Sequence, residues 1–112
     1  MTDTLDIKTT VKPAADRAEV IARLRAHEME IRALLATALY LYGSAARDEM
    51  TDESDVDVFI DYDPDGPYSF VELIRGGDYL RSILGRPVDF TTRYGLHPRL
   101  RARIEISCFR VF

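Results

Sequence analysis

The sequence describes a small acidic domain. It has 112 residues, 46% of them hydrophobic, and a formal net charge of −4. A chain of this length builds one hydrophobic core but not two, so we divide it into a polar tail, residues 1–12, and one domain, residues 13–112. The acidic balance argues against nucleic acid as a direct partner, because such binding depends on neutralising phosphates.

No segment of the sequence predicts export or membrane insertion. The longest apolar run, residues 33–41, is about half as long as the roughly 20 residues of a membrane-spanning helix. The first residues are acidic, whereas a secretion signal begins with basic residues. The single cysteine, Cys108, permits no internal disulfide and is expected to pack as a small apolar residue. These features predict a cytoplasmic protein without membrane contact.

Helical spacing of apolar residues predicts three main helices. Residues 13–31 are expected to form one amphipathic helix that begins at Pro13. Residues 68–84 form a second helix, which is expected to break at the Gly76-Gly77 pair because glycine weakens a helix interior. A third, short helix is expected over residues 97–105, with Pro98 in its first turn.

Alternation of hydrophobic and polar residues predicts three strands, at residues 36–42, 55–61 and 87–91. In the second strand the two valines and Ile60 share one face, and the aspartates share the other with Phe59 as an exception. The order of strands and helices predicts an α/β fold. We expect a small mixed β-sheet with helices packed on one face and the carboxylates on the other.

The segment from Gly43 to Asp57 carries the clearest functional signal. Gly43 and Ser44 follow the first strand and open a short helix, where free N–H groups and the serine hydroxyl face an anion such as a phosphate. After ten further residues, Asp55 and Asp57 share one face of the second strand, about 6 to 7 Å apart. Such a pair can hold two divalent ions about 3.5 to 4 Å apart, which supports in-line displacement at phosphorus.

A third carboxylate comes from the next strand. Asp89 and Thr91 alternate there with Val88 and Phe90, so the aspartate is expected on the polar face. If the two strands are neighbours, Asp89 lies beside the pair Asp55 and Asp57. It can then complete a metal site or take the proton from an attacking hydroxyl.

Together, Gly43-Ser44, Asp55-Val56-Asp57 and Asp89 resemble the polymerase-β-type nucleotidyltransferases, and in particular the minimal (MNT) proteins related to MntA antitoxins. The resemblance implies a minimal nucleotidyltransferase domain over residues 13–112. It implies that the three aspartates bind two magnesium ions and that Asp89 also activates the nucleophile. The nucleotide-binding residues that it implies are Gly43, Ser44, Arg47 and Ser54.

One position departs from the family pattern. Asp48 follows Arg47 where the family usually has a glycine. The extra negative charge lies close to the expected phosphate site, so it would oppose triphosphate binding.

The resemblance further implies transfer of AMP from ATP onto a tyrosine of a HEPN-domain toxin, which would make the chain an antitoxin. One alternative is a non-catalytic antitoxin or adaptor that neutralises its partner by binding alone, and a weaker one is transfer to a small molecule. The chain is too short to add a domain that presents an acceptor, so a partner is expected to bring the hydroxyl. Residues 97–105 read first as a solvated cationic helix face, with Arg99 and Arg103 as candidates for partner contact.

Overall fold

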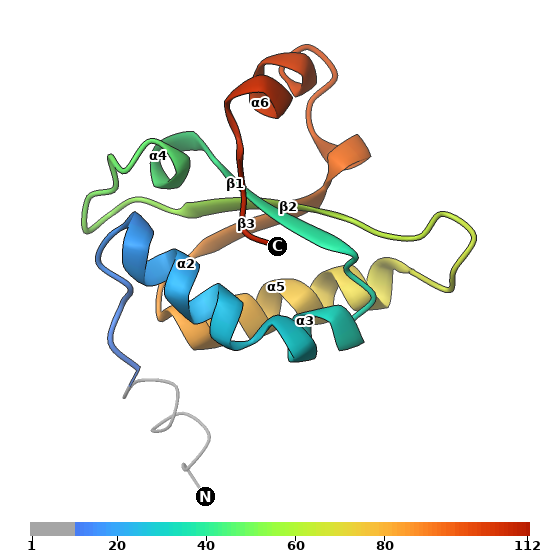
Figure 1. Ribbon diagram of the computed structural model, residues 1–112, viewed down its shortest axis with the longest axis horizontal. Coiled ribbons are helices and arrows are strands. Elements are labelled where there is room, and N and C mark those ends of the chain that lie inside the picture. Colours follow the sequence, from blue (N-terminus) through green and yellow to red (C-terminus); the bar gives the residue numbers. More distant parts are fainter. Residues whose placement is uncertain (1–10) are drawn as a thin grey trace, which may run out of the picture.

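A four-stranded mixed sheet organises the computed structural model, which describes residues 11–112 (Figure 1). Strand β1 pairs antiparallel with β2 and with β4, whereas β2 pairs parallel with β3, so the sheet order is β3-β2-β1-β4. The predicted α/β fold with a mixed sheet is thereby confirmed. The predicted tail, residues 1–12, lies outside the described residues except for its last two. The strands are β1 (Ala38–Tyr42), β2 (Val56–Asp61), β3 (Val88–Thr92) and β4 (Phe109–Arg110).

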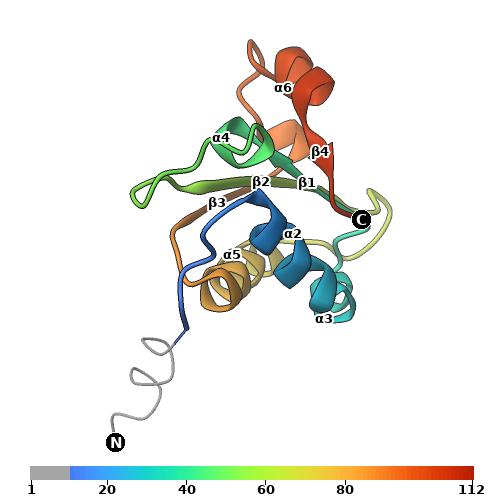
Figure 2. The same ribbon diagram turned by 60° about the vertical axis from the view of Figure 1, so that its left-hand side comes forward.

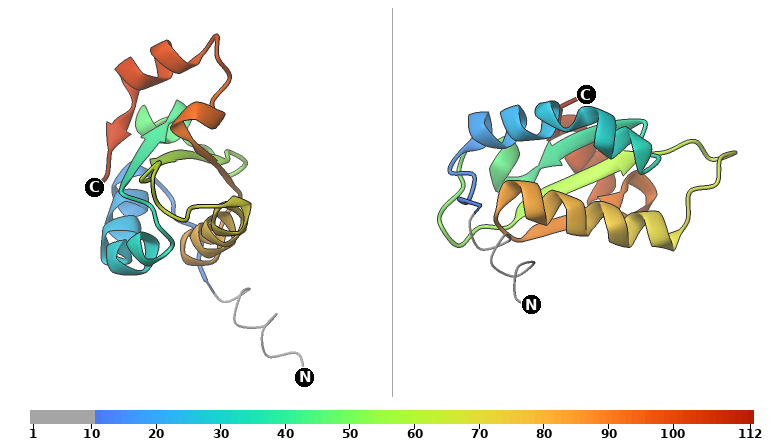
Figure 3. Two further views of the ribbon diagram at one scale, coloured as in Figure 1. Left: turned by 90° about the vertical axis from the view of Figure 1, so that its right-hand side faces the viewer. Right: turned by 90° about the horizontal axis from the view of Figure 1, so that it is seen from below.

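Helices lie on both sides of this sheet but in unequal amounts. Helices α2 (Arg17–Ala26), α3 (Glu28–Ala33) and α5 (Phe70–Leu84) cover one face (Figures 2 and 3). The short elements α4 (Gly43–Ala46), η1 (Arg93–Gly95) and α6 (Arg101–Ser107) lie on the opposite side. The main helix layer therefore shields one face, as predicted, and leaves the other to the short elements and the carboxylates.

The hydrophobic core fills the space between the sheet and the main helix layer. Its strand members alternate along β1 and β2, which is the pattern of strands with one face on a core. Complete burial of these side chains is the main stabilising contribution to a domain of this size. The fully buried residues of this cluster include Val20, Leu24, Leu39, Leu41, Val56, Val58, Leu80 and Leu84.

The predicted helix over residues 13–31 is wrong in its start and its continuity. Helix α2 begins after Asp16, whose carboxylate accepts a hydrogen bond of 2.9 Å from the Glu19 amide. This cap satisfies a free N–H of the first turn, which explains why the helix starts here and not at Pro13. The chain leaves helical geometry at His27, and α3 follows as a separate helix.

The expected break at Gly76-Gly77 is also wrong, because α5 is continuous through both glycines. A Cβ at Gly76 would lie 2.7 Å from the Phe90 ring of β3. The missing side chain therefore lets the helix approach the sheet closely. Helix α5 starts at a capping box between Ser69 and Glu72, which supplies the stability that glycine removes.

The C-terminal helix begins later than predicted. Pro98 lies in a turn, and α6 starts at Arg101. The residues after it form β4, which extends the sheet beside β1. Among residues 11–112, no helix combines the length and apolar character that a membrane span requires.

Candidate active site

The parallel pairing of β2 with β3 brings two of the predicted carboxylates together. Asp57 lies directly opposite Asp89 in the register, and Val58 lies opposite Phe90. Because side chains alternate along a strand, the aspartates share the face away from the main helix layer. Asp57 is half-buried and Asp89 is exposed. Asp55 is exposed and lies one residue before β2 begins, so the structure places it at the entrance of the strand.

The pKa of Asp57 reflects the charged residues that lie near it. Burial, together with the negative charges of Asp89 and Asp55, raises the pKa of Asp57 to about 6. The positive charge of Arg47 acts in the opposite direction on the pKa of Asp57. Asp89, Asp55 and Arg47 are therefore all close enough to Asp57 for their charges to act on its carboxylate.

The turn from β1 into α4 packs directly on this carboxylate group. Gly43 has a φ of +66°, a conformation that favours glycine, and a Cβ at this position would overlap Oδ2 of Asp57. Glycine is therefore required here for two reasons, the positive φ of the turn and the contact between the backbone and the Asp57 carboxylate. It places the first N–H groups of α4, which have no acceptor within the helix, beside Asp57. Ser44 lies in this first turn.

Carboxylate oxygens are the ligand type that magnesium prefers, and Asp57 and Asp89 supply them from adjacent strands. Within residues 11–112, no three histidine, cysteine or acidic side chains already converge as a complete set of metal ligands. Asp57 and Asp89 therefore fit a divalent ion as a pair of protein ligands. Asp55 lies in the loop directly before β2 and does not complete a set of three with them.

Two predicted nucleotide-binding residues have other partners in the structure. The Nε of Arg47 donates a 2.8 Å hydrogen bond to Oε1 of the exposed Glu49. The hydroxyl of Ser54 accepts a hydrogen bond of 2.9 Å from the Thr51 amide, which closes the turn before Asp55. The charge of Arg47 nevertheless acts on the carboxylate of Asp57. Ser54 instead stabilises the turn of the loop that leads to Asp55.

Asp48 is explained by its backbone and its partner. Its φ of +57° is a conformation that glycine and aspartate tolerate better than most residues. Its Oδ1 accepts a hydrogen bond of 3.1 Å from the Arg17 amide at the start of α2. The carboxylate that was expected to oppose phosphate binding is therefore turned to a helix N-terminus, where negative charge is favourable.

A cleft opens beside the carboxylates, between the sheet and the C-terminal residues. It has a volume of about 360 Å³ and combines a polar floor with a largely apolar wall. The wall comes from η1, α6 and the turn between them. The lining residues are Tyr42, Asp57, Asp89, Thr91, Gly95, Leu96, His97, Leu100 and Ile104.

Sequence reasoning missed Arg86, the one buried charged residue of residues 11–112. Its guanidinium donates hydrogen bonds to the carbonyl oxygens of Ala14, at 2.7 Å, of Ser54, at 2.7 Å, and of Thr51. It therefore ties the loop before Asp55 to the segment before β3. A larger hollow of about 580 Å³ lies beside Arg86, but none of the predicted site residues lines it. No local pattern reveals such an arginine, because its partners are backbone carbonyls far away in the sequence.

We compared the chain, whose strand register, glycine turn and cleft are described above, with known protein families. Residues 24–111 match the family described as nucleotidyltransferase domain. The chain belongs to this family. The predicted membership in the polymerase-β superfamily is confirmed, and the match covers the sheet, α4, α5 and most of the C-terminal residues of this nucleotidyltransferase domain.

The domain is also similar to individual proteins. It is 39% identical to "Putative protein adenylyltransferase MJ1379" of Methanocaldococcus jannaschii over 69 residues, which are 61% of this chain and 69% of the relative. It is 35% identical to "Putative protein adenylyltransferase MJ0126" of the same organism over 89 residues, 78% of this chain and 89% of the relative.

Solved structures share the fold of this nucleotidyltransferase domain. One described as "Structure of putative minimal nucleotidyltransferase" is similar with a TM-score of 0.64 and 27% identity, over 80% of this chain and 93% of that one. Another, described as "Crystal structure of the toxin-antitoxin with AMP-PNP", has a TM-score of 0.60 and 17% identity, over 86% and 72% of the two chains. At this identity the second likeness concerns the fold alone.

Proposed function

We propose that this chain is a magnesium-dependent nucleotidyltransferase that moves AMP from ATP onto a tyrosine hydroxyl of a partner protein. The observation that carries the proposal is the register that sets Asp57 opposite Asp89, with the Gly43 turn packed on Asp57. The turn that we propose as the phosphate site therefore packs on one of the carboxylates that we propose as metal ligands. The relatives named as protein adenylyltransferases support the choice of AMP and of a protein acceptor.

The reaction follows from this arrangement. The triphosphate of ATP lies against the first turn of α4, where Ser44 and the backbone N–H groups bind its oxygens. The acceptor oxygen attacks the α-phosphorus as the bond from that phosphorus to the bridging oxygen breaks. Pyrophosphate leaves with the electron pair of that bond, and AMP stays joined to the acceptor oxygen. Asp89 takes the proton of the hydroxyl, because it is the exposed carboxylate at the cleft.

Asp55, Asp57 and Asp89 are the residues that would hold magnesium. When bound, the metal neutralises phosphate charge and aligns the attacking and leaving oxygens. Two other residues of the chain support these carboxylates. Gly43 keeps the backbone close to Asp57, and Arg47 supplies positive charge near the same carboxylate.

The partner that we propose is a HEPN-domain toxin, with this chain as its antitoxin. The likeness of the fold to chains of toxin–antitoxin structures supports this choice. The cleft beside the carboxylates has a volume of about 360 Å³, which leaves room for an acceptor side chain from a second protein.

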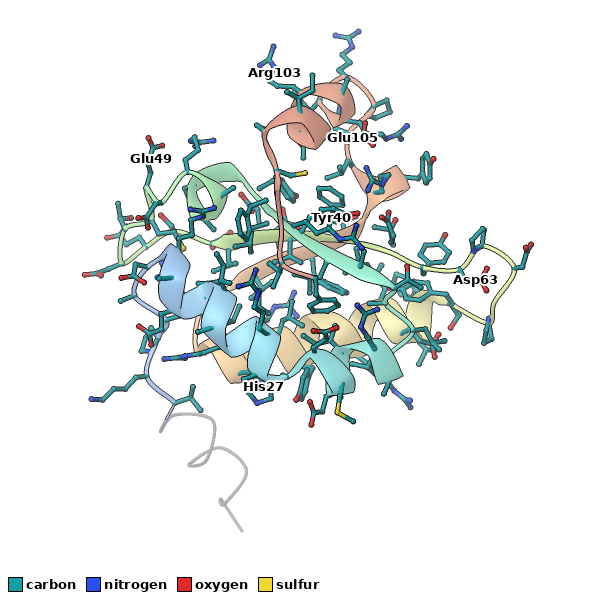
Figure 4. The ribbon with its side chains drawn as sticks, in the orientation of Figure 1. His27, Tyr40, Glu49, Asp63, Arg103 and Glu105 are labelled. Atoms are coloured by element: carbon teal, nitrogen blue, oxygen red, sulfur yellow. The ribbon has the colours of Figure 1, made fainter. Side chains whose placement is uncertain are left out.

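Calorimetry with ATP and magnesium tests the nucleotide part of the proposal. The variant carrying both Asp55→Asn and Asp57→Asn should lose magnesium-dependent ATP binding, because the metal loses two charged ligands. The variant carrying both Asp63→Asn and Asp65→Asn removes the same charge from the loop at the opposite end of β2 and should bind normally (Figure 4). Equal ATP affinity of the two double variants would contradict the site.

Mass spectrometry tests the transfer part. Incubation of the chain with its partner, ATP and magnesium should add AMP to the partner and not to this chain, because positioning of the acceptor supplies much of the catalysis. An inhibited but unmodified partner would instead support a role by binding alone.

A further inference from the structure

The residues between β3 and β4 form a platform above the site, which we call the C-terminal arm (residues 93–107). Arg93 anchors it to the sheet, since its Nε and Nη2 donate to the two carboxylate oxygens of Asp61 at 2.8 and 2.9 Å. Its Nη1 donates to Glu105 of α6 at 2.7 Å. Pairing of β4 with β1 holds the other end. The arm is therefore fixed in place over the carboxylate face.

Three large apolar side chains of the arm are exposed. Ile106 is 87% exposed, Tyr94 is 76% exposed and Leu100 is 46% exposed. These side chains come from η1, the following turn and α6, so they are distributed along the whole arm. Exposed apolar side chains gathered on one short segment are typical of a surface that a partner covers.

The arm is also the cationic part of an acidic chain. It holds four arginines and one acid, Glu105, which Arg93 already binds. Arg99 and Arg103 are exposed, and Arg103 points outward from α6 (Figure 4). By contrast, residues 48–65 contain nine acids and no basic residue. The arm thus carries positive charge on its exposed surface, whereas the floor of the cleft carries the carboxylates of Asp57 and Asp89.

We propose that the C-terminal arm docks an acidic segment of the acceptor protein and guides its tyrosine into the cleft. This inference rests on the proposed function and adds the surface and the chemistry by which the acceptor is chosen. The arginines attract the acidic residues of the segment, which speeds encounter and fixes its direction. The exposed apolar side chains bury against the segment and supply contact area.

The shape of the cleft favours an aromatic hydroxyl. The arm contributes Leu96, Leu100 and Ile104 to the wall, and these side chains offer no hydrogen bond. A tyrosine has an apolar ring that packs on such a wall and a polar tip that reaches Asp89. A serine or threonine hydroxyl would leave most of the 360 Å³ unfilled.

The same charges disfavour nucleic acid as the occupant. An RNA strand on the arm would bring further phosphates close to those of the bound ATP and to the carboxylates of Asp57 and Asp89 at the floor. A peptide avoids this repulsion because its backbone is neutral and its acidic side chains can stay on the outer surface. The observations therefore favour a protein segment.

A labelled random copolymer of glutamate and tyrosine is a suitable probe for the binding test. We expect the copolymer to bind this chain, with an affinity that falls as the salt concentration rises. Fluorescence anisotropy measures this affinity. The double variant Arg99→Glu and Arg103→Glu should weaken binding roughly tenfold or more. The double variant Lys12→Glu and Arg75→Glu makes the same charge change at exposed positions elsewhere and should bind like the unchanged chain. Equal weakening in both double variants would overturn the inference.

Two further probes define the chemistry of the site. Polyglutamate without tyrosine should bind more weakly than the copolymer, and Leu100→Ala should reduce the difference. Labelled oligouridylate should not compete. Polyglutamate binding as tight as the copolymer, or oligouridylate displacing it, would contradict docking of an acidic tyrosine segment.

ATP titration of the same samples separates this inference from the proposed function. Normal magnesium-dependent ATP binding without copolymer binding would reject the docking surface and leave the nucleotide site standing. Copolymer binding without ATP binding would support the surface and contradict the nucleotide site. The Arg99 and Arg103 variant should bind ATP normally, because both side chains are exposed on the arm.

Discussion

The Arg86 guanidinium donates a hydrogen bond of 2.7 Å to the carbonyl oxygen of Ser54, the residue directly before Asp55. A second bond from the same nitrogen reaches Thr51, and the other terminal nitrogen reaches Ala14. Arg86 also lies two residues before β3, the strand that carries Asp89. One buried side chain thus sets the spacing between the two segments that supply the carboxylates.

Replacement of Arg86 by Gln should therefore weaken metal binding about 10- to 100-fold, the usual effect of removing a group that orients metal ligands. Electron paramagnetic resonance with manganese measures this affinity. Arg23→Gln is the matched control, because Arg23 also binds three backbone carbonyls but none in the loop before Asp55. Both variants should be less stable to urea. Equal manganese affinity in the two would assign Arg86 a purely structural role.

Gly43→Ala should abolish ATP binding while the chain stays folded. The added Cβ would overlap the Asp57 carboxylate, and the positive φ costs roughly 1–2 kcal/mol for a residue with a side chain. Gly66→Ala is the control, since Gly66 lies in the exposed loop after Asp65 and its added Cβ meets only Asp63. Circular dichroism confirms folding, and calorimetry measures ATP binding. Normal binding by Gly43→Ala would show that the turn does not touch the nucleotide.

Asp89→Asn separates chemistry from binding. If Asp89 is chiefly the base and Asp55 and Asp57 are the main metal ligands, AMP transfer should fall by roughly 10²- to 10⁴-fold while ATP affinity changes little. Transfer to the partner is followed by mass spectrometry, and ATP affinity by calorimetry. A parallel loss of both would make Asp89 mainly a metal ligand. Unchanged transfer would remove it from the site.

Asp61 should make the stability of the chain sensitive to acid. The hydrogen bonds from Arg93, with a further one from Tyr40, lower the pKa of Asp61. Its contribution is therefore complete above the unfolded-state pKa of about 3.9, and it is lost as pH falls through the folded-state pKa. Asp61→Asn should cost about 1–2 kcal/mol of unfolding free energy at pH 7, since the site is partly exposed.

Urea denaturation at pH 7, 5 and 3 checks this sign. The difference between the unchanged chain and Asp61→Asn should persist at pH 5 and shrink at pH 3. Asp52→Asn, at an exposed turn position, should show a small difference at every pH. A gap that widens in acid would be inconsistent with the Asp61–Arg93 ion pair.

Asp48 should affect stability more than nucleotide affinity. Asp48→Ala loses the hydrogen bond to the Arg17 amide and places alanine at a positive φ, so it should destabilise the chain by about 1–2 kcal/mol. Asp48→Asn keeps an acceptor oxygen and tolerates the same φ, so it should be milder. ATP affinity of Asp48→Gly should equal that of the unchanged chain. Tighter ATP binding by the glycine variant would show that the Asp48 charge does repel phosphate.

Much of the fold was predictable because the strands have strong local patterns. Alternation in residues 55–61 gave the correct faces, and Phe59 lies on the aspartate side as expected. The sequence did not predict that Phe59 is fully buried there. Its ring stacks on Tyr40 of the neighbouring strand at a centroid distance of 4.6 Å. Pairing partners of this kind come from other strands and leave no trace in the local sequence.

Tertiary contacts explain the failures. Propensity alone predicts a break at Gly76-Gly77, but the approach of Phe90 requires a residue without a side chain there. The carboxylates were predictable because their spacing is local and their strand register follows from core patterning. Arg86 was not, because a buried arginine is defined by carbonyls at distant positions.

The opposition of Asp57 and Asp89 has a consequence for refolding. A slip of one residue along β3 would turn Asp89 toward the helix layer and bring Phe90 out to the solvent side, so the apolar interior itself enforces the correct pairing. Metal affinity should consequently return with the same time course as tyrosine fluorescence when the denatured chain is diluted from urea. Evolution of the apolar interior and of the carboxylate constellation is then coupled, since a sequence that keeps the first inherits the alignment of the second.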